Sequence, residues 1–89
     1  MIELHAIFRG KVQGVGFRWT IVDHAEKFQL KGTVQNLPNG TVEVYAQGPK
    51  EALEAFIESV NKDSGLARID SLFCEYKKPD NSYHGFQII

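Results

Sequence analysis

The clearest structural signal in the sequence is Gly32-Thr-Val-Gln-Asn-Leu-Pro-Asn-Gly-Thr-Val-Glu-Val-Tyr-Ala-Gln47. Its first part, Thr33–Leu37, predicts a strand, and apolar and polar residues then alternate from Val42 to Gln47, which is typical of a half-buried strand. Between them stands Pro38-Asn-Gly40, a strong turn signal because Asn and Gly accept positive φ angles. The segment therefore predicts an antiparallel hairpin.

A strand, a loop and a helix precede this hairpin. Residues Ile2–Phe8 alternate between apolar and polar and predict a first strand. Three glycines then stand in the seven residues Gly10–Gly16, so we expect the strand to end and a loop to begin at Gly10. Thr20 is the expected cap of a helix whose apolar face consists of Ile21, Val22, Ala25 and Phe28.

A second helix and two strands follow the hairpin. Gly48-Pro49 predicts the start of the helix, since proline suits the first helical position, and its apolar face is Leu53, Phe56, Ile57 and Val60. A fourth strand is expected at Ile69–Lys77. Its apolar residues occur in both phases, which indicates a bulge or a strand buried on both sides. A short last strand is expected near Phe86 and Ile88.

The predicted order is strand, helix, strand, strand, helix, strand, with the short strand at the end. This order is typical of the α+β ferredoxin-like split βαβ sandwich: two helices on one face of a mainly antiparallel sheet of four to five strands. The 89 residues are expected to form a single domain, 1–89. A chain of this size buries too little surface for a deep, enclosed active site, so a surface loop is the expected place for chemistry.

Composition narrows the function classes. The formal net charge of −1 argues against a nucleic-acid partner. No signal peptide or membrane-length apolar run is visible, so we expect a cytoplasmic protein without membrane contact. His5, His24 and His84 show no metal-ligand spacing, and no metal site is predicted. Cys74, the only cysteine, is interpreted as a small core or edge-strand residue. We expect Glu3 and Glu43 to be solvated and the core to include Phe17, Trp19 and Phe28.

The loop Gly10-Lys-Val-Gln-Gly-Val-Gly-Phe-Arg18 is the segment most suggestive of chemistry. Backbone N–H groups of a Gly-rich loop before a helix can converge on an anion, and the planar fork of Arg18 can grip two phosphate oxygens. The loop lacks the Lys-Ser or Lys-Thr ending of a Walker loop, and Trp19 stands where the dinucleotide fingerprint needs a glycine. On physical grounds alone, a tight turn beside a surface arginine explains it about as well.

The same loop resembles the signature loop of the acylphosphatase family. Gly32-Thr-Val-Gln-Asn36 followed by Asn39-Gly-Thr-Val-Glu43 is similar to that family's second signature, and Phe86-Gln-Ile88 to its usual ending. The resemblance covers essentially the whole chain. It implies hydrolysis of acyl phosphates without a metal or cofactor. It also implies that Arg18 and Asn36 are catalytic and that the phosphate is bound by Gln13, Gly14, Val15, Gly16 and Phe17.

Phosphate or sulfate should bind the Gln13–Arg18 loop and inhibit, because its N–H groups and the helix end favour a tetrahedral anion. The protein is expected to be a monomer. The resemblance adds one further expectation. Gln29 stands where the family often has glycine, which predicts a positive φ just past the end of the first helix. Lys11 stands where arginine is more usual, and Thr33 where an aromatic is often found. Without the resemblance, Asn36 would be interpreted as a turn residue.

Two other function classes fit the same fold. An RNA-binding module would need a basic sheet face with aromatics on its central strands, whereas the third strand offers one aromatic and an acid. A noncatalytic anion sensor, or an accessory domain of a larger carbamoyl-handling machine, would keep the loop without turnover. The length of 89 residues, which suits a free-standing domain, leads us to expect that the protein is not such an accessory domain. The sequence leaves the physiological acyl group open.

Overall fold

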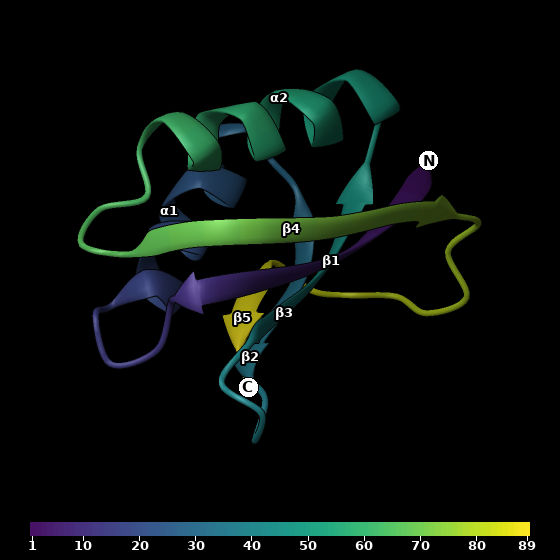
Figure 1. Ribbon diagram of the computed structural model, residues 1–89. Coiled ribbons are helices and arrows are strands. Elements are labelled where there is room, and N and C mark those ends of the chain that lie inside the picture. Colours follow the sequence, from purple (N-terminus) through teal and green to yellow (C-terminus); the bar gives the residue numbers. More distant parts are fainter.

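The computed structural model describes residues 1–89 and consists of two helices packed on a five-stranded sheet (Figure 1). The strand order is β4-β1-β3-β2-β5, and every pairing is antiparallel except that of β2 with β5. Both helices lie on the same face of the sheet, so the ferredoxin-like prediction is confirmed. The elements are β1 (Ile2–Lys11), α1 (Phe17–Lys27), β2 (Lys31–Asn36), β3 (Val42–Gly48), α2 (Lys50–Lys62), β4 (Arg68–Lys77) and β5 (Phe86–Ile88).

The core lies between the sheet and the two helices. Alternation along β1 and β3 turns every second side chain toward the helices, and on the central strands these side chains are fully buried: Leu4, Ala6, Phe8, Val42, Val44 and Ala46. The apolar face of α2 meets them with Leu53, Phe56 and Val60, which are also fully buried. The second strand of the predicted hairpin, β3, is therefore the central strand of the sheet.

The passage from β1 into α1 differs from the predicted one at both ends. β1 continues through Gly10 to Lys11, which pairs with Arg68 of β4, so the loop begins later than expected. α1 begins at Phe17 rather than after Thr20, and the Thr20 N–H already donates to the Gly16 carbonyl at 3.2 Å. The predicted Thr20 cap is wrong because the backbone conformation of Gly16, with φ 75°, starts the helix earlier.

The expected irregularity of the fourth strand is a bulge. Arg9 pairs with Ser71 while the next residue, Gly10, pairs with Ile69, which leaves Asp70 as the extra residue on β4. In a regular strand, Ile69 and Leu72 would point to opposite faces of the sheet because they are three residues apart. The extra residue places both side chains on the helix-facing side. β4 is an edge strand, and Cys74 lies exposed on it.

The end of α1 confirms the prediction for Gln29, whose φ is 57°. The Gln29 N–H donates to the Glu26 carbonyl and the Leu30 N–H to the Ala25 carbonyl, at 3.1 and 3.0 Å. This pair of hydrogen bonds defines a Schellman ending, in which the residue at the Gln29 position adopts a left-handed conformation. The buried side chains of Ala25 and Leu30 supply the apolar contact that accompanies it.

The face of the sheet away from the helices carries a charged cluster centred on His5. Its Nε2 lies 2.8 Å from Glu43 and its Nδ1 3.0 Å from Glu75, and its ring stacks on Tyr45 at 4.5 Å. Burial lowers the pKa of His5, but the hydrogen bonds and charges of the two carboxylates outweigh it, so the pKa is raised. The surface is thus not the basic sheet that an RNA-binding module would need.

Glu3 corrects the expectation of a solvated carboxylate. It is 1% exposed, accepts a hydrogen bond from the Gln47 side chain at 2.8 Å and lies 3.5 Å from the Lys77 ammonium group. A buried carboxylate is tolerated when it is paired and hydrogen-bonded, and the antiparallel partners of Glu3 on β3 and β4, Gln47 and Lys77, supply both. Strand register, which the sequence does not display, is what hides this charge.

Candidate functional site

The loop between β1 and α1 presents a run of free backbone donors. None of the N–H groups from Gln13 through Trp19 donates a hydrogen bond to a backbone carbonyl, and no side chain caps the start of α1. Gly14 and Gly16 have φ angles of 76° and 75°, a conformation that L side chains rarely adopt. A Cβ atom at either position would meet nothing within 4 Å, so this backbone faces open space. The loop can therefore receive an anion.

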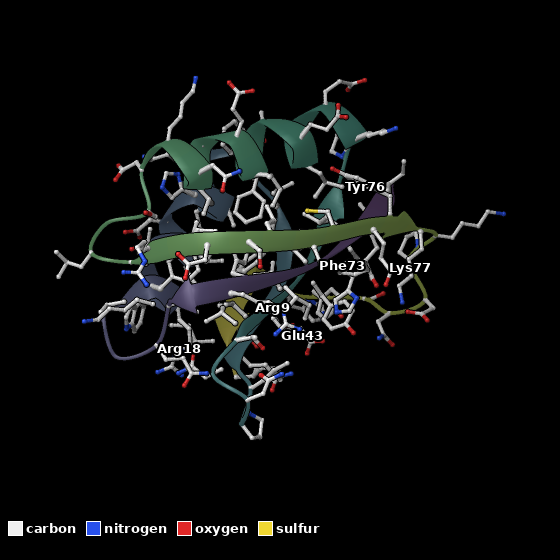
Figure 2. The ribbon with its side chains drawn as sticks, in the orientation of Figure 1. Arg9, Arg18, Glu43, Phe73, Tyr76 and Lys77 are labelled. Atoms are coloured by element: carbon white, nitrogen blue, oxygen red, sulfur yellow. The ribbon has the colours of Figure 1, made fainter.

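Arg18 stands in the first turn of α1, beside these donors. Its side chain is partly exposed and takes part in no ion pair or hydrogen bond within the chain. Figure 2 shows it at the end of the molecule where β1 leads into α1. The guanidinium thus remains free to bind an external anion, with the positive end of the helix behind it.

Gln13 fastens this loop to the turn between β2 and β3. Its side-chain Nε2 donates to the carbonyl oxygens of Leu37 and Thr41 at 2.8 and 2.9 Å. The turn is held in its own shape by Asn39, whose Oδ1 accepts from the Thr41 N–H and hydroxyl. Because both Gln13 donors point into the turn, only its main-chain N–H is left for a ligand. The two sequence signatures are brought together by this one side chain.

Asn36 is the last residue of β2 and pairs with Val42. Side chains alternate along the strand, so Asn36 points to the same, helix-covered side as the buried Val34. Its Oδ1 is buried and accepts no hydrogen bond. Buried polar atoms without a partner are uncommon in proteins, and here the atom lies next to the turn that Gln13 ties to the loop.

Phe17 and Val15 anchor the loop to the core. Phe17 is 1% exposed and packs edge to face on Phe8, with 5.2 Å between ring centroids, and Val15 is partly buried against the same core. Their side chains point inward, so only their N–H groups can face a ligand. The site residues predicted from the sequence therefore form one loop of main-chain donors with the free guanidinium of Arg18 beside it. Gln13 ties this loop to the turn that follows Asn36.

Trp19 is exposed, which corrects its assignment to the core. Its exposed fraction is 68%. Successive helical residues are about 100° apart, so a helix that begins at Phe17 places Trp19 about 200° around from it. Trp19 instead joins an open groove of about 580 Å³ between α1 and β5, which is lined by Arg18, Trp19, Val22, Phe86, Gln87 and Ile88. Because the helix was predicted to begin only after Thr20, the sequence pattern did not place Trp19 on the helix surface.

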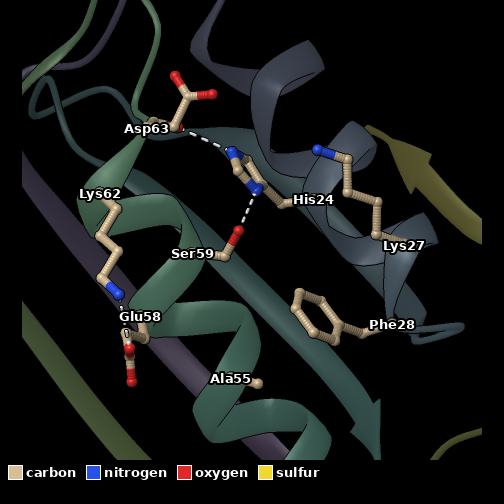
Figure 3. Close-up of a pocket in the computed structure, with 8 residues that line it drawn as sticks. All are labelled: His24, Lys27, Phe28, Ala55, Glu58, Ser59, Lys62 and Asp63. Atoms are coloured by element: carbon tan, nitrogen blue, oxygen red, sulfur yellow. Dashed lines mark hydrogen bonds and ion pairs between the residues drawn. The ribbon is translucent and has the colours of Figure 1, made fainter.

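A second cleft, of about 420 Å³, lies between α1 and α2 and contains the buried His24 (Figure 3). The His24 Nδ1 lies 2.6 Å from the Ser59 hydroxyl, and its Nε2 lies 2.7 Å from the carbonyl oxygen of Asp63 at the end of α2. The Asp63 carboxylate makes no hydrogen bond to the ring. The arrangement lacks the carboxylate partner of a catalytic triad and fastens the two helices together.

No group of three or more His, Cys, Asp and Glu side chains is gathered where it could hold a metal ion. Neither helix combines the length and the apolar character that a membrane crossing requires.

Fold and site together define a small α+β domain with a loop of free main-chain N–H groups beside a free guanidinium. Residues 4–88 match the family model described as acylphosphatase. The chain is 35% identical to the acylphosphatase of Bacillus subtilis over all of its length and 98% of that protein, and 36% identical to that of Thermococcus kodakarensis over 99% of the chain and 96% of that protein. The crystal structure of the Bacillus subtilis acylphosphatase superposes with a TM-score of 0.94, covering 100% of this chain and 99% of that one. This protein belongs to the acylphosphatase family.

The same fold unit also occurs within a larger protein. The whole chain matches 12% of the crystal structure of Thermococcus kodakarensis HypF, with 34% identity and a TM-score of 0.89.

Proposed function

We propose that this protein hydrolyses acyl phosphates to a carboxylate and inorganic phosphate. The proposal rests on family membership and on one structural observation. The free N–H groups of the Gln13–Phe17 loop and the free guanidinium of Arg18 are tied to the strand that ends at Asn36 by the two hydrogen bonds of Gln13. This arrangement places a receptor for a phosphoryl group beside the amide of Asn36, whose Oδ1 has no hydrogen-bond partner in the chain.

In this proposal the loop and Arg18 bind the phosphoryl group. Main-chain N–H groups and the helix end favour a tetrahedral anion, and the guanidinium fork contacts two of its oxygens. The charge on those oxygens changes during phosphoryl transfer, and preorganised donors stabilise it without reorganisation. The same groups therefore serve in binding and in catalysis.

Asn36 positions the attacking water. Its Oδ1 is buried without a hydrogen-bond donor in the chain. In this proposal the amide group turns toward the loop, where a water molecule supplies that hydrogen bond. The water oxygen bonds to phosphorus while the bridging bond between phosphorus and the acyl oxygen breaks. The electron pair of that bond leaves with the carboxylate, and one water proton is released to the phosphate or to solvent. Most of the catalysis then comes from placement.

The leaving group makes a general acid unnecessary. A carboxylic acid has a pKa of about 4, so the departing oxygen needs no proton at neutral pH. Binding and placement are the tasks that remain, and the loop, Arg18 and Asn36 are sufficient for them in this proposal. The proposed mechanism uses no metal ion.

The deciding experiment is hydrolysis of benzoyl phosphate by the purified protein, with and without EDTA. We expect turnover that EDTA leaves unchanged and that phosphate or sulfate inhibits competitively. Absence of turnover would leave the anion-sensor or accessory-domain alternative. Loss of activity in EDTA, restored by a divalent cation, would overturn the metal-free mechanism alone.

A further inference from the structure

The groove beside Arg18 is mainly apolar, and its only polar lining residues are Arg18 and Gln87. It lies between the first turns of α1 and the short edge strand β5, and four of its six lining residues are Trp19, Val22, Phe86 and Ile88. Arg18 is its only charged residue. A groove of this composition suits a ligand with a negative head and an apolar body.

The helix flank that forms one wall is continuous. Val22 is four residues from Arg18 and three from Trp19, and residues at these spacings are neighbours on a helix surface. The guanidinium and the indole therefore border the same groove. Trp19 is 68% exposed, and so large an apolar surface left in water is a cost that a bound apolar group would remove.

The opposite wall comes from β5, which packs beside α1 and pairs with β2. Phe86 is 8% exposed and belongs to the core, whereas Ile88 is partly buried against it. The floor of the groove is thus fixed by the core, and Trp19 is its exposed side. Such a site needs little rearrangement to bind a flat or branched group.

From this geometry we propose that the groove is the acyl-group subsite and that Trp19 is a specificity-determining residue. The inference rests on the proposed function, because it takes Arg18 as the phosphoryl anchor. A phosphoryl group held by Arg18 places the attached acyl group at the start of the groove. The preferred substrates are then acyl phosphates with an aromatic or branched apolar acyl group, rather than acetyl phosphate.

Steady-state kinetics with two substrates tests this. Wild type should have a higher kcat/KM for benzoyl phosphate than for acetyl phosphate. Trp19→Ala should lower kcat/KM for benzoyl phosphate about 3- to 10-fold, mainly through KM, since aromatic contacts have that strength. Its acetyl phosphate kinetics should stay within about twofold, and Trp19→Phe should retain most of the selectivity.

The matched control is Phe73→Ala, which removes a half-exposed aromatic from β4, at the opposite edge of the sheet. It should leave the kinetics with both substrates unchanged. Equal losses for the two substrates in Trp19→Ala, or no loss for either, would overturn the inference while leaving the proposed hydrolysis intact.

A binding experiment separates the groove from the chemistry. Trp19 is the only tryptophan, so intrinsic fluorescence reports on this position alone. Benzylphosphonate should bind more tightly than methylphosphonate and shift the emission to shorter wavelength, and inorganic phosphate should displace it. This result without turnover of any acyl phosphate would refute the proposed function but keep the groove as a subsite. Equal affinity of the two phosphonates, or no emission shift, would overturn the subsite itself.

Discussion

Gln13 and Leu37, which are 24 residues apart in the chain, are joined by a 2.8 Å hydrogen bond from a side-chain amide to a main-chain carbonyl. The same amide nitrogen donates to the Thr41 carbonyl, so one side chain joins the loop after β1 to the hairpin turn. The catalytic geometry proposed for Arg18 and Asn36 depends on the relative position of these two segments. Gln13 is therefore a positioning residue in this proposal.

Replacement of Gln13 should impair turnover more than stability. Gln13→Ala should lower kcat about tenfold or more, because misplaced groups lose catalytic efficiency steeply, while stability falls by about 1 kcal/mol, since both carbonyls keep another donor. Gln13→Glu should be worse than Ala despite its matching shape, because it sets an acceptor against two carbonyl oxygens. Urea unfolding and steady-state kinetics measure both quantities. An unchanged kcat in the folded Ala variant would show that Gln13 is only structural.

Arg18→Ala should raise KM and lower kcat together, because the guanidinium contacts the phosphoryl group in both the ground and transition states. Lysine should restore little of either, since an ammonium group cannot reproduce the two-pronged grip. Phosphate inhibition should weaken in parallel with KM. If Arg18→Lys regains wild-type kinetics, a point charge is sufficient and the forked contact is wrong.

Asn36→Ala should lower kcat with KM and the phosphate inhibition constant nearly unchanged, because the water it positions is not part of substrate affinity. Loss of a positioning contact commonly costs about 10²–10³ in kcat. The orphaned Oδ1 predicts that the variant folds normally, since no internal hydrogen bond of that atom is lost. The control is a wild-type circular dichroism spectrum and cooperative melt. Near-full kcat in a folded Asn36→Ala protein would make Asn36 a turn residue only.

Gln29→Gly should be neutral or stabilise the fold by up to about 1 kcal/mol, because glycine relieves the left-handed strain of an L residue. The φ of 57° and the Schellman hydrogen bonds motivate the change. Gln29→Ala is the matched control and should give no gain, because alanine keeps the Cβ atom. Thermal and urea unfolding of the three proteins would show it. A clear destabilisation by glycine would contradict the strained ending.

His5 should make stability depend on pH. Its pKa is raised in the folded protein, against the effect of burial, by Glu75 and Glu43. The folded state therefore holds this proton more tightly than the unfolded chain, so the contribution is fully present below the unfolded pKa of about 6.5 and is lost as pH rises through the folded pKa. The stacked Tyr45 ring stays neutral in this window, because burial and the charge of Glu43 raise its pKa.

The measurement is the unfolding free energy of wild type and His5→Gln at pH 5.5 and at pH 8. The advantage of wild type should be larger at pH 5.5. Glu75→Gln removes one of the two carboxylates and should shrink the pH dependence. A difference between wild type and His5→Gln that stays constant with pH would show that the ring contributes only packing.

The order of elements, the central hairpin and the presence of the bulge could be predicted from local patterns. Alternation, helical spacing and turn residues are patterns that extend over only a few positions. Asn39-Gly40 predicted the hairpin turn, and the odd and even positions of Ile69 and Leu72 indicated the bulge. Family resemblance extended this to the left-handed Gln29 and to the proposed roles of Arg18 and Asn36. Those proposed roles depend on which residue stands at each position, and the sequence gives this directly.

Features that depend on contacts between segments distant in the chain could not be predicted from local patterns. Strand register buried Glu3 beside Gln47 and Lys77, and the φ of Gly16 began α1 early enough to turn Trp19 away from the core. Packing of α1 against β5 then set Trp19 and Arg18 on one groove. Solvent exposure and tertiary contacts are properties of the folded protein. The identity of a residue does not tell which distant residues the fold will place beside it.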